Sequence, residues 1–89
     1  MAELCRFLGI VVRMFSERHA PHHRPHLHAV YQESQVVLAL DTIEVLAGQL
    51  PRRQQRLLEG WAELHQAELL AAWRVAMTGE APPGIEPLR

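Results

Sequence analysis

The sixteen residues HLHAVYQESQVVLALD (residues 26–41) decide the fold of this chain. They contain two apolar and β-branched runs, residues 26–32 and 35–41, which are separated only by Glu33 and Ser34. Such runs favour β-strands, and a connection of this length is typical of a hairpin. We therefore expect an antiparallel hairpin here, with the rest of a small sheet built around it.

Two further segments predict strands beside this hairpin. Residues 7–15 (FLGIVVRMF) are short, apolar and followed by a turn-like segment with two prolines, which is typical of a strand that has ended. Residues 43–48 (IEVLAG) predict a short additional strand that ends at Gly48. The sequence thus predicts an antiparallel sheet of three to four strands.

Residues 51–78 change to a helical period and predict one long helix. Pro51 suits a first-turn position, and Gly79 suits the end of the helix. Both tryptophans lie on the broad apolar side of this helix, which comprises Leu57, Leu58, Trp61, Ala62, Leu64, His65, Leu69, Ala72, Trp73 and Ala76. Strands followed by one helix predict an α+β fold in which the C-terminal helix packs across one face of the sheet.

The size and composition of the chain predict one small folded domain. Its 89 residues are 48% hydrophobic and 21% charged, which is typical of a globular chain. We expect a single α+β domain over residues 1–80 and a proline-rich tail over residues 81–89. A chain this short is only marginally stable alone, so a small protein partner or a homodimer is expected.

Charge and cysteine content indicate a cytoplasmic protein. The formal net charge of −1 provides no overall attraction to nucleic acid or to an anionic membrane, so RNA binding would need a local patch. Cys5 is the only cysteine and cannot form an intramolecular disulfide, which fits a reducing compartment. We expect no signal peptide and no membrane contact, because no apolar run approaches the ~20 residues of a membrane span.

Strand alternation predicts which side chains the helix leaves uncovered. If the helix packs on one face of the sheet, that face carries Ile10, Val12, Met14, Leu27, Ala29 and Tyr31. Arg13, His26 and His28 then project from the opposite face. This open face is the candidate functional surface.

The histidine spacing is compatible with a metal site. His26 and His28 lie on one face of a strand, about 6.6 Å apart along the backbone. His22 can bend back beyond Pro25 as a third ligand, which would give a site for zinc or another transition metal with one open position. No carboxylate has an equally evident place, although Asp41 is a candidate, as is Glu33, if the hairpin brings either one round.

The same residues suit acid/base catalysis without a metal. His26 and His28 can serve as general base and general acid, while Arg13 stabilises a phosphate. Metal-independent cleavage of RNA requires these roles, with the RNA 2′-hydroxyl as internal nucleophile. The candidate supporting donors are Tyr31 and His22, although alternation predicts that Tyr31 faces the helix side.

A third interpretation involves no catalysis. Histidines that flank prolines can simply order a loop, and an open face with Arg13, Val11 and Val30 can bind a partner or a second copy. His65 lies within the apolar side of the helix, where a hydrogen-bonded core histidine is expected.

Four segments together resemble a known family: FLGIVVRM, HHRPHLHAVY, GWAELHQAELLAAW and IEPL. They are similar to the small bacterial family catalogued as domain of unknown function 4160. The positions that fit its pattern are Arg13, His22, Pro25, His26, His28, Tyr31, Trp61, His65 and Trp73. The chain departs from the pattern at Arg24 (usually proline), Leu27 (phenylalanine) and Pro21 (often acidic).

The resemblance implies a biological setting more than a reaction. Members look like short prokaryotic genes beside another small gene, an arrangement similar to toxin–antitoxin pairs, and this favours a cytosolic binding partner. We expect a small protein of a toxin–antitoxin-like or accessory module that acts through the open face. The alternatives are a non-enzymatic, antitoxin-like regulatory subunit and a metal site that uses His22, His26 and His28.

Overall fold

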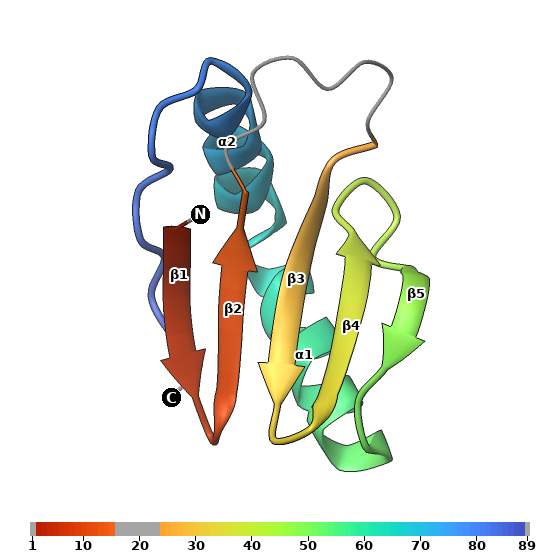
Figure 1. Cartoon of the computed structure of the whole chain (residues 1–89). Helices are drawn as coiled ribbons and strands as arrows, with labels where there is room; N and C mark the ends of the chain where they lie inside the picture. Colours follow the sequence, from red (N-terminus) through yellow and green to blue (C-terminus); the bar gives the residue numbers. More distant parts are fainter. Residues whose placement is uncertain (1, 16–23, 89) are drawn as a thin grey trace.

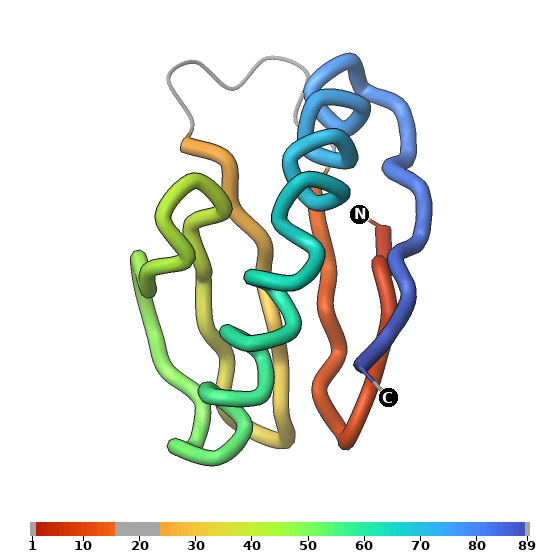
Figure 2. The backbone as a smooth tube through the Cα atoms, turned by 180° about the vertical axis from the view of Figure 1, so that it is seen from behind, coloured from red at the N-terminus to blue at the C-terminus, as the bar shows by residue number. Residues whose placement is uncertain are grey.

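The computed structural model describes residues 2–15 and 24–88, which form one antiparallel sheet and two helices (Figure 1). The strands pair in chain order and are β1 (Ala2–Phe7), β2 (Ile10–Met14), β3 (His26–Tyr31), β4 (Ser34–Ala39) and β5 (Val45–Gln49). The helices α1 (Arg52–Leu64) and α2 (Gln66–Met77) both lie on one side of the sheet, as the two opposite views show (Figures 1 and 2).

The predicted architecture of three to four strands with one long helix is wrong: the described residues form five strands and two helices. Residues 7–15 were expected to be one strand, yet Phe7 ends β1 and Ile10 begins β2. Leu8 and Gly9 form the turn between them, with φ angles of 49° and 82°. Turns with two positive φ angles normally carry Asn or Gly, so a leucine at the first position concealed this hairpin.

The predicted helix over residues 51–78 is interrupted at His65. This residue has φ −110° and ψ 19°, so α1 ends before it and α2 begins after it. The Gln66 side chain donates hydrogen bonds to the backbone carbonyls of Leu40 (2.8 Å) and Asp41 (3.2 Å). These contacts attach the start of α2 to the turn that follows β4, which accounts for a break that no proline or glycine marks.

The core lies between the helices and the sheet face they cover. Its largest fully buried side chains include Ile10, Val12, Met14, Leu27, Leu38, Leu58, Trp61 and Leu69. Trp61 is completely buried and packs against Phe7, with 5.4 Å between the ring centroids. Buried and half-buried residues alternate along β2 and β3, so the half-buried residues form the open face of the sheet, which the helices do not cover.

The C-terminal segment covers the outer edge of β1. It runs beside this strand in both views (Figures 1 and 2). The backbone N–H of Ile85 donates to the carbonyl of Leu4 (3.0 Å), and the Trp61 indole donates to the carbonyl of Glu86 (2.8 Å). Because the Ile85 side chain is also buried in the core cluster, this segment is an integral part of the packing.

Candidate functional site

Strand register brings Arg13 and His28 together on the open face. Arg13 of β2 lies directly opposite His28 of β3, and His28 lies opposite Val37 of β4. All three side chains are half-buried, in contrast to their fully buried neighbours Val12 and Leu27. The side chains of such cross-strand pairs are adjacent, so an arginine and an imidazole share one small area of this face.

His26 and His28 form an adjacent pair of imidazoles. Their ring centroids are 5.2 Å apart, and the ring planes are at 67° to each other. Each histidine also lies against one more aromatic ring: the ring centroid of Phe15 is 4.5 Å from that of His28 in an edge-on contact, and that of Trp73 in α2 is 5.0 Å from that of His26 in a tilted contact. His26 therefore lies where the open face meets the helix layer, whereas only the open face was expected.

The backbone sets the tautomer of His26. Its Nδ1 lies 2.8 Å from the carbonyl oxygen of Arg24. A carbonyl oxygen only accepts hydrogen bonds, so Nδ1 must carry the proton and donate it. In the neutral ring Nε2 then holds the lone pair, which is the atom that a general base or a metal ligand would use.

The Arg24 side chain binds Asp41, one of the two carboxylates that were candidates for a metal shell. Its guanidinium lies 3.1 Å from Asp41 and 3.8 Å from Glu44, and it donates a hydrogen bond to Thr42 (2.8 Å). This guanidinium holds the pKa of the Asp41 carboxyl below its ordinary value. Asp41 is therefore engaged in an exposed ion pair.

Within residues 2–15 and 24–88, no three His, Cys, Asp or Glu side chains are close enough together to hold a metal ion. The predicted third ligand, His22, lies outside the described residues. Glu33 lies in the turn after Tyr31, at the end of β3 opposite to His26. The described part of the predicted metal set is thus the pair His26 and His28.

Tyr31 is not part of this cluster. It lies opposite Ile10 in the sheet and packs against the hydrophobic core. A Cβ added to Gly9 would be only 3.0 Å from the Tyr31 ring, which shows how closely the ring covers the turn before β2. The alternation that predicted the helix side for Tyr31 agrees with this position, and the residue has no evident role beside His28.

The open face is hollowed next to His28. A depression of about 320 Å³ is lined by His28, Gln35, Val37, Ala47 and Gly48 from β3, β4 and β5. Its floor is the sheet itself, so a ligand bound there would contact the His28 ring from the side of β4.

The sequence model of a family described as a domain of unknown function (DUF4160) matches residues 9–74. The match covers well over half of the chain. The chain belongs to the DUF4160 family. The resemblance predicted from the sequence is thereby confirmed. No curated protein and no solved structure matches the chain.

The DUF4160 match includes the whole Arg13, His26 and His28 cluster together with both helices up to Arg74. Three contributors to the site were not predicted: Phe15, Trp73 and the backbone of Arg24. A signal existed only for Trp73, which the helical periodicity placed on the side that faces the sheet. In the described part of this DUF4160 chain, no helix is long and apolar enough to cross a membrane.

Proposed function

We propose that this protein is a small component of a toxin–antitoxin-like or accessory module and cleaves RNA without a metal at the open sheet face. One observation carries the proposal. Arg13 and the two imidazoles of His26 and His28 form a single cluster, in which the rings are 5.2 Å apart and the arginine lies directly across from His28. A base, an acid and an anion-binding group in one place are what metal-independent phosphodiester cleavage needs.

The geometry favours a particular division of roles. His26 acts as the base, because its Nδ1–H is held by the Arg24 carbonyl and its Nε2 accepts the proton of the RNA 2′-hydroxyl. The 2′-oxygen then attacks the phosphorus, and the bond from phosphorus to the 5′-oxygen breaks. Protonated His28 donates a proton to that leaving oxygen, while Arg13 neutralises charge on the phosphoryl oxygens. The products are a 2′,3′-cyclic phosphate and a free 5′-hydroxyl.

The proposal is tested with labelled single-stranded RNA in the presence of a chelator. His26→Ala and His28→Ala are each expected to slow cleavage by about a hundredfold or more, which is the usual contribution of a general acid or base. His65→Gln is the matched control, because this imidazole pairs with Glu68 at the helix break and lies outside the cluster. If cleavage is unchanged in both His26→Ala and His28→Ala, and circular dichroism shows an intact fold, the two histidines have no part in the mechanism.

A second candidate function is protein binding at the same face. Val11, Val30 and Val37 are half-buried there, and neither helix covers them. We propose as the partner a small protein with an apolar contact and a carboxylate opposite Arg13, so that the chain serves as an antitoxin-like subunit. Arg13→Glu is then expected to abolish co-purification of the partner, whereas Leu64→Lys on the exposed side of α1 should preserve it.

Metal content separates both candidates from the metal-site alternative. If His22, His26 and His28 bind zinc or another transition metal, protein purified without chelator should contain about one equivalent, the stoichiometry of a single three-ligand site. His26→Ala should then lose the metal. We also propose a cytoplasmic location, since the single cysteine, Cys5, is a buried free thiol.

A further inference from the structure

The two outer edges of the sheet differ in whether another segment covers them. The C-terminal segment covers β1 through the hydrogen bond from Ile85 to Leu4. On the outer side of β5, by contrast, no strand pairs in the part of the chain that the structure describes. All five residues of β5 are exposed and uncharged, and Val45 and Leu46 are 43% and 42% exposed. Open edges of this kind bind further strands unless charge or a covering segment prevents it.

The residues on either side of β5 carry opposite charges. Asp41 and Glu44 precede the strand, whereas Arg52, Arg53 and Arg56 follow it at the start of α1. Among the described residues, these three arginines form no ion pair. The strand is therefore an uncharged segment between an acidic end and a basic end.

Arg24 neutralises only part of the acidic end. It pairs with Asp41 at 3.1 Å and approaches Glu44 at 3.8 Å, so one guanidinium meets two carboxylates and one net negative charge is left. The Glu44 side chain is 69% exposed. It is thus accessible to a positive charge from outside this copy of the chain.

We propose that β5 pairs with β5 of a second copy of this chain, antiparallel and about a two-fold axis at Ala47. An antiparallel arrangement places the acidic end of each strand beside the basic end of the other, so both ends attract. A parallel arrangement would place like charges together. In the antiparallel pair, Val45 faces Gln49 of the second copy, and Glu44 faces Leu50 of the second copy.

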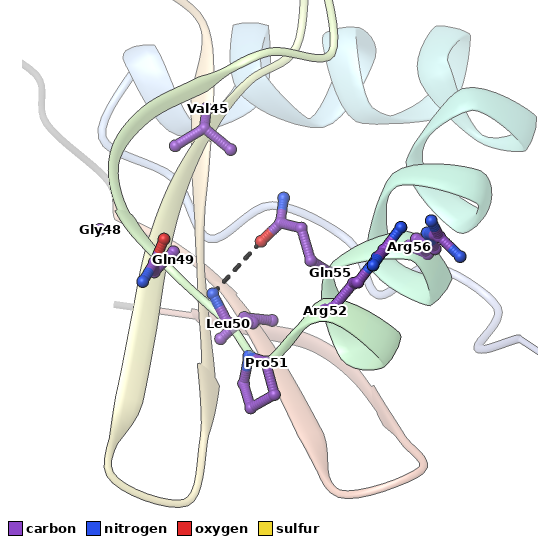
Figure 3. Close-up of a pocket in the computed structure, with 8 residues that line it drawn as sticks. All are labelled: Val45, Gly48, Gln49, Leu50, Pro51, Arg52, Gln55 and Arg56. Atoms are coloured by element: carbon purple, nitrogen blue, oxygen red, sulfur yellow. Dashed lines mark hydrogen bonds between the residues drawn. The ribbon is translucent and has the colours of Figure 1, made fainter.

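A groove is present where the acidic end of the second copy would lie. It has a volume of about 620 Å³ between β5 and the first turns of α1, and Val45, Leu50, Pro51, Arg52 and Arg56 are among its lining residues (Figure 3). Figure 3 shows Arg52 and Arg56 on the helix side and Val45 on the strand side. The arginines of this groove suit Glu44 of the second copy, whose side chain is 69% exposed.

Sedimentation equilibrium over a range of protein concentrations tests the proposal. The full chain is expected to be a dimer whose dissociation constant rises with salt. Leu46→Lys, which places two like charges near the axis, is expected to raise that constant at least about tenfold. Leu64→Lys is the matched control, because Leu64 is also exposed but lies at the far end of α1.

A charge exchange tests the antiparallel arrangement itself. Glu44→Arg and Arg52→Glu should each weaken the dimer, and the double variant should recover most of the loss, since the charges then attract with reversed sign. A chain that is monomeric at every concentration would overturn the proposal. So would a dimer that Leu46→Lys leaves intact and Arg13→Glu dissociates, because the contact would then lie on the open face.

Discussion

The two faces of the sheet are built from alternate residues of the same strands and have opposite properties. On β3, Leu27 is completely buried beneath the helices, whereas the next residue, His28, is half-buried on the open face. On β2, Val12 and Arg13 show the same contrast. Strand alternation thus separates the residues that stabilise the fold from those that we propose to be functional, although they are consecutive in the chain.

This comparison predicts that neighbouring substitutions will have very different effects. The covered face is close-packed, so loss of a side chain there leaves a cavity. Side chains on the open face, such as Arg13 and His28, are only half-buried, so loss of a side chain there should mainly affect function. The predictions that follow test this separation, from the largest expected effect to the smallest.

Leu27→Ala should have the largest effect. Leu27 is fully buried in the core cluster, and truncation of such a leucine costs about 2–5 kcal/mol of unfolding free energy. The change is measured by urea denaturation monitored by tryptophan fluorescence, because both tryptophans belong to the same core. A loss well below 1 kcal/mol would mean that the helices do not pack on this face as described.

Alkaline pH should lower the free energy of unfolding through Cys5, which is buried in the core. Burial raises the pKa of this thiol from 9.0 to about 11. The folded state therefore holds the thiol proton more tightly than the unfolded state. The protonated thiol's contribution to the free energy of unfolding is complete below about pH 9 and is lost as the pH rises toward 11. The free energies of unfolding of the wild type and of Cys5→Ala, measured at about pH 9 and at about pH 11, give the size of this contribution. An identical alkaline loss in the two proteins would show that Cys5 is not responsible.

Gly60→Ala should stabilise the protein slightly. Gly60 lies inside α1, and a Cβ added there would meet nothing within 4 Å, so an alanine side chain fits without displacing a neighbour. Replacing an exposed helical glycine by alanine gains about 0.5–1 kcal/mol. A rise in the midpoint of thermal unfolding is the expected result, whereas a fall would indicate an unrecognised contact on this side of α1.

His28→Ala should have the smallest effect on stability. The ring contacts Phe15 and His26 at the edge of the packing, so the free energy of unfolding should change by less than about 1 kcal/mol. Urea denaturation beside Leu27→Ala gives the comparison directly. A loss as large as that of Leu27→Ala would contradict the separation of the two faces and indicate a structural role for His28.

The sequence predicted the strands of the central hairpin well but not the ends of the other elements. Two turns were missed because their residues are atypical: Leu8 occupies a position with positive φ, and His65 interrupts the helix without a proline or glycine. The break at His65 depends on Gln66, which reaches carbonyls that are 25 and 26 positions away in the chain. Contacts of this kind cannot be found from local periodicity.

The candidate site was predicted in its residue types but not in its arrangement. Alternation placed Arg13 and His28 on one face, but their direct opposition depends on the register between β2 and β3, which the sequence does not specify. The contact of His26 with Trp73 required knowledge of where α2 crosses the sheet. The role of the Arg24 carbonyl could not have been predicted from side-chain identity, because any residue has a carbonyl there.

The most direct test of the proposed function is the identity of the RNA product. Purified protein is incubated in chelator with an oligonucleotide that contains one ribonucleotide in a DNA background, and the ends are analysed by mass spectrometry. The account predicts cleavage at the ribonucleotide with a 2′,3′-cyclic phosphate, no cleavage of the all-DNA control, and cleavage slowed by about a hundredfold or more in His28→Ala. Ends that carry a 5′-phosphate, or cleavage of the all-DNA control, would contradict it, as would intact RNA at every protein concentration.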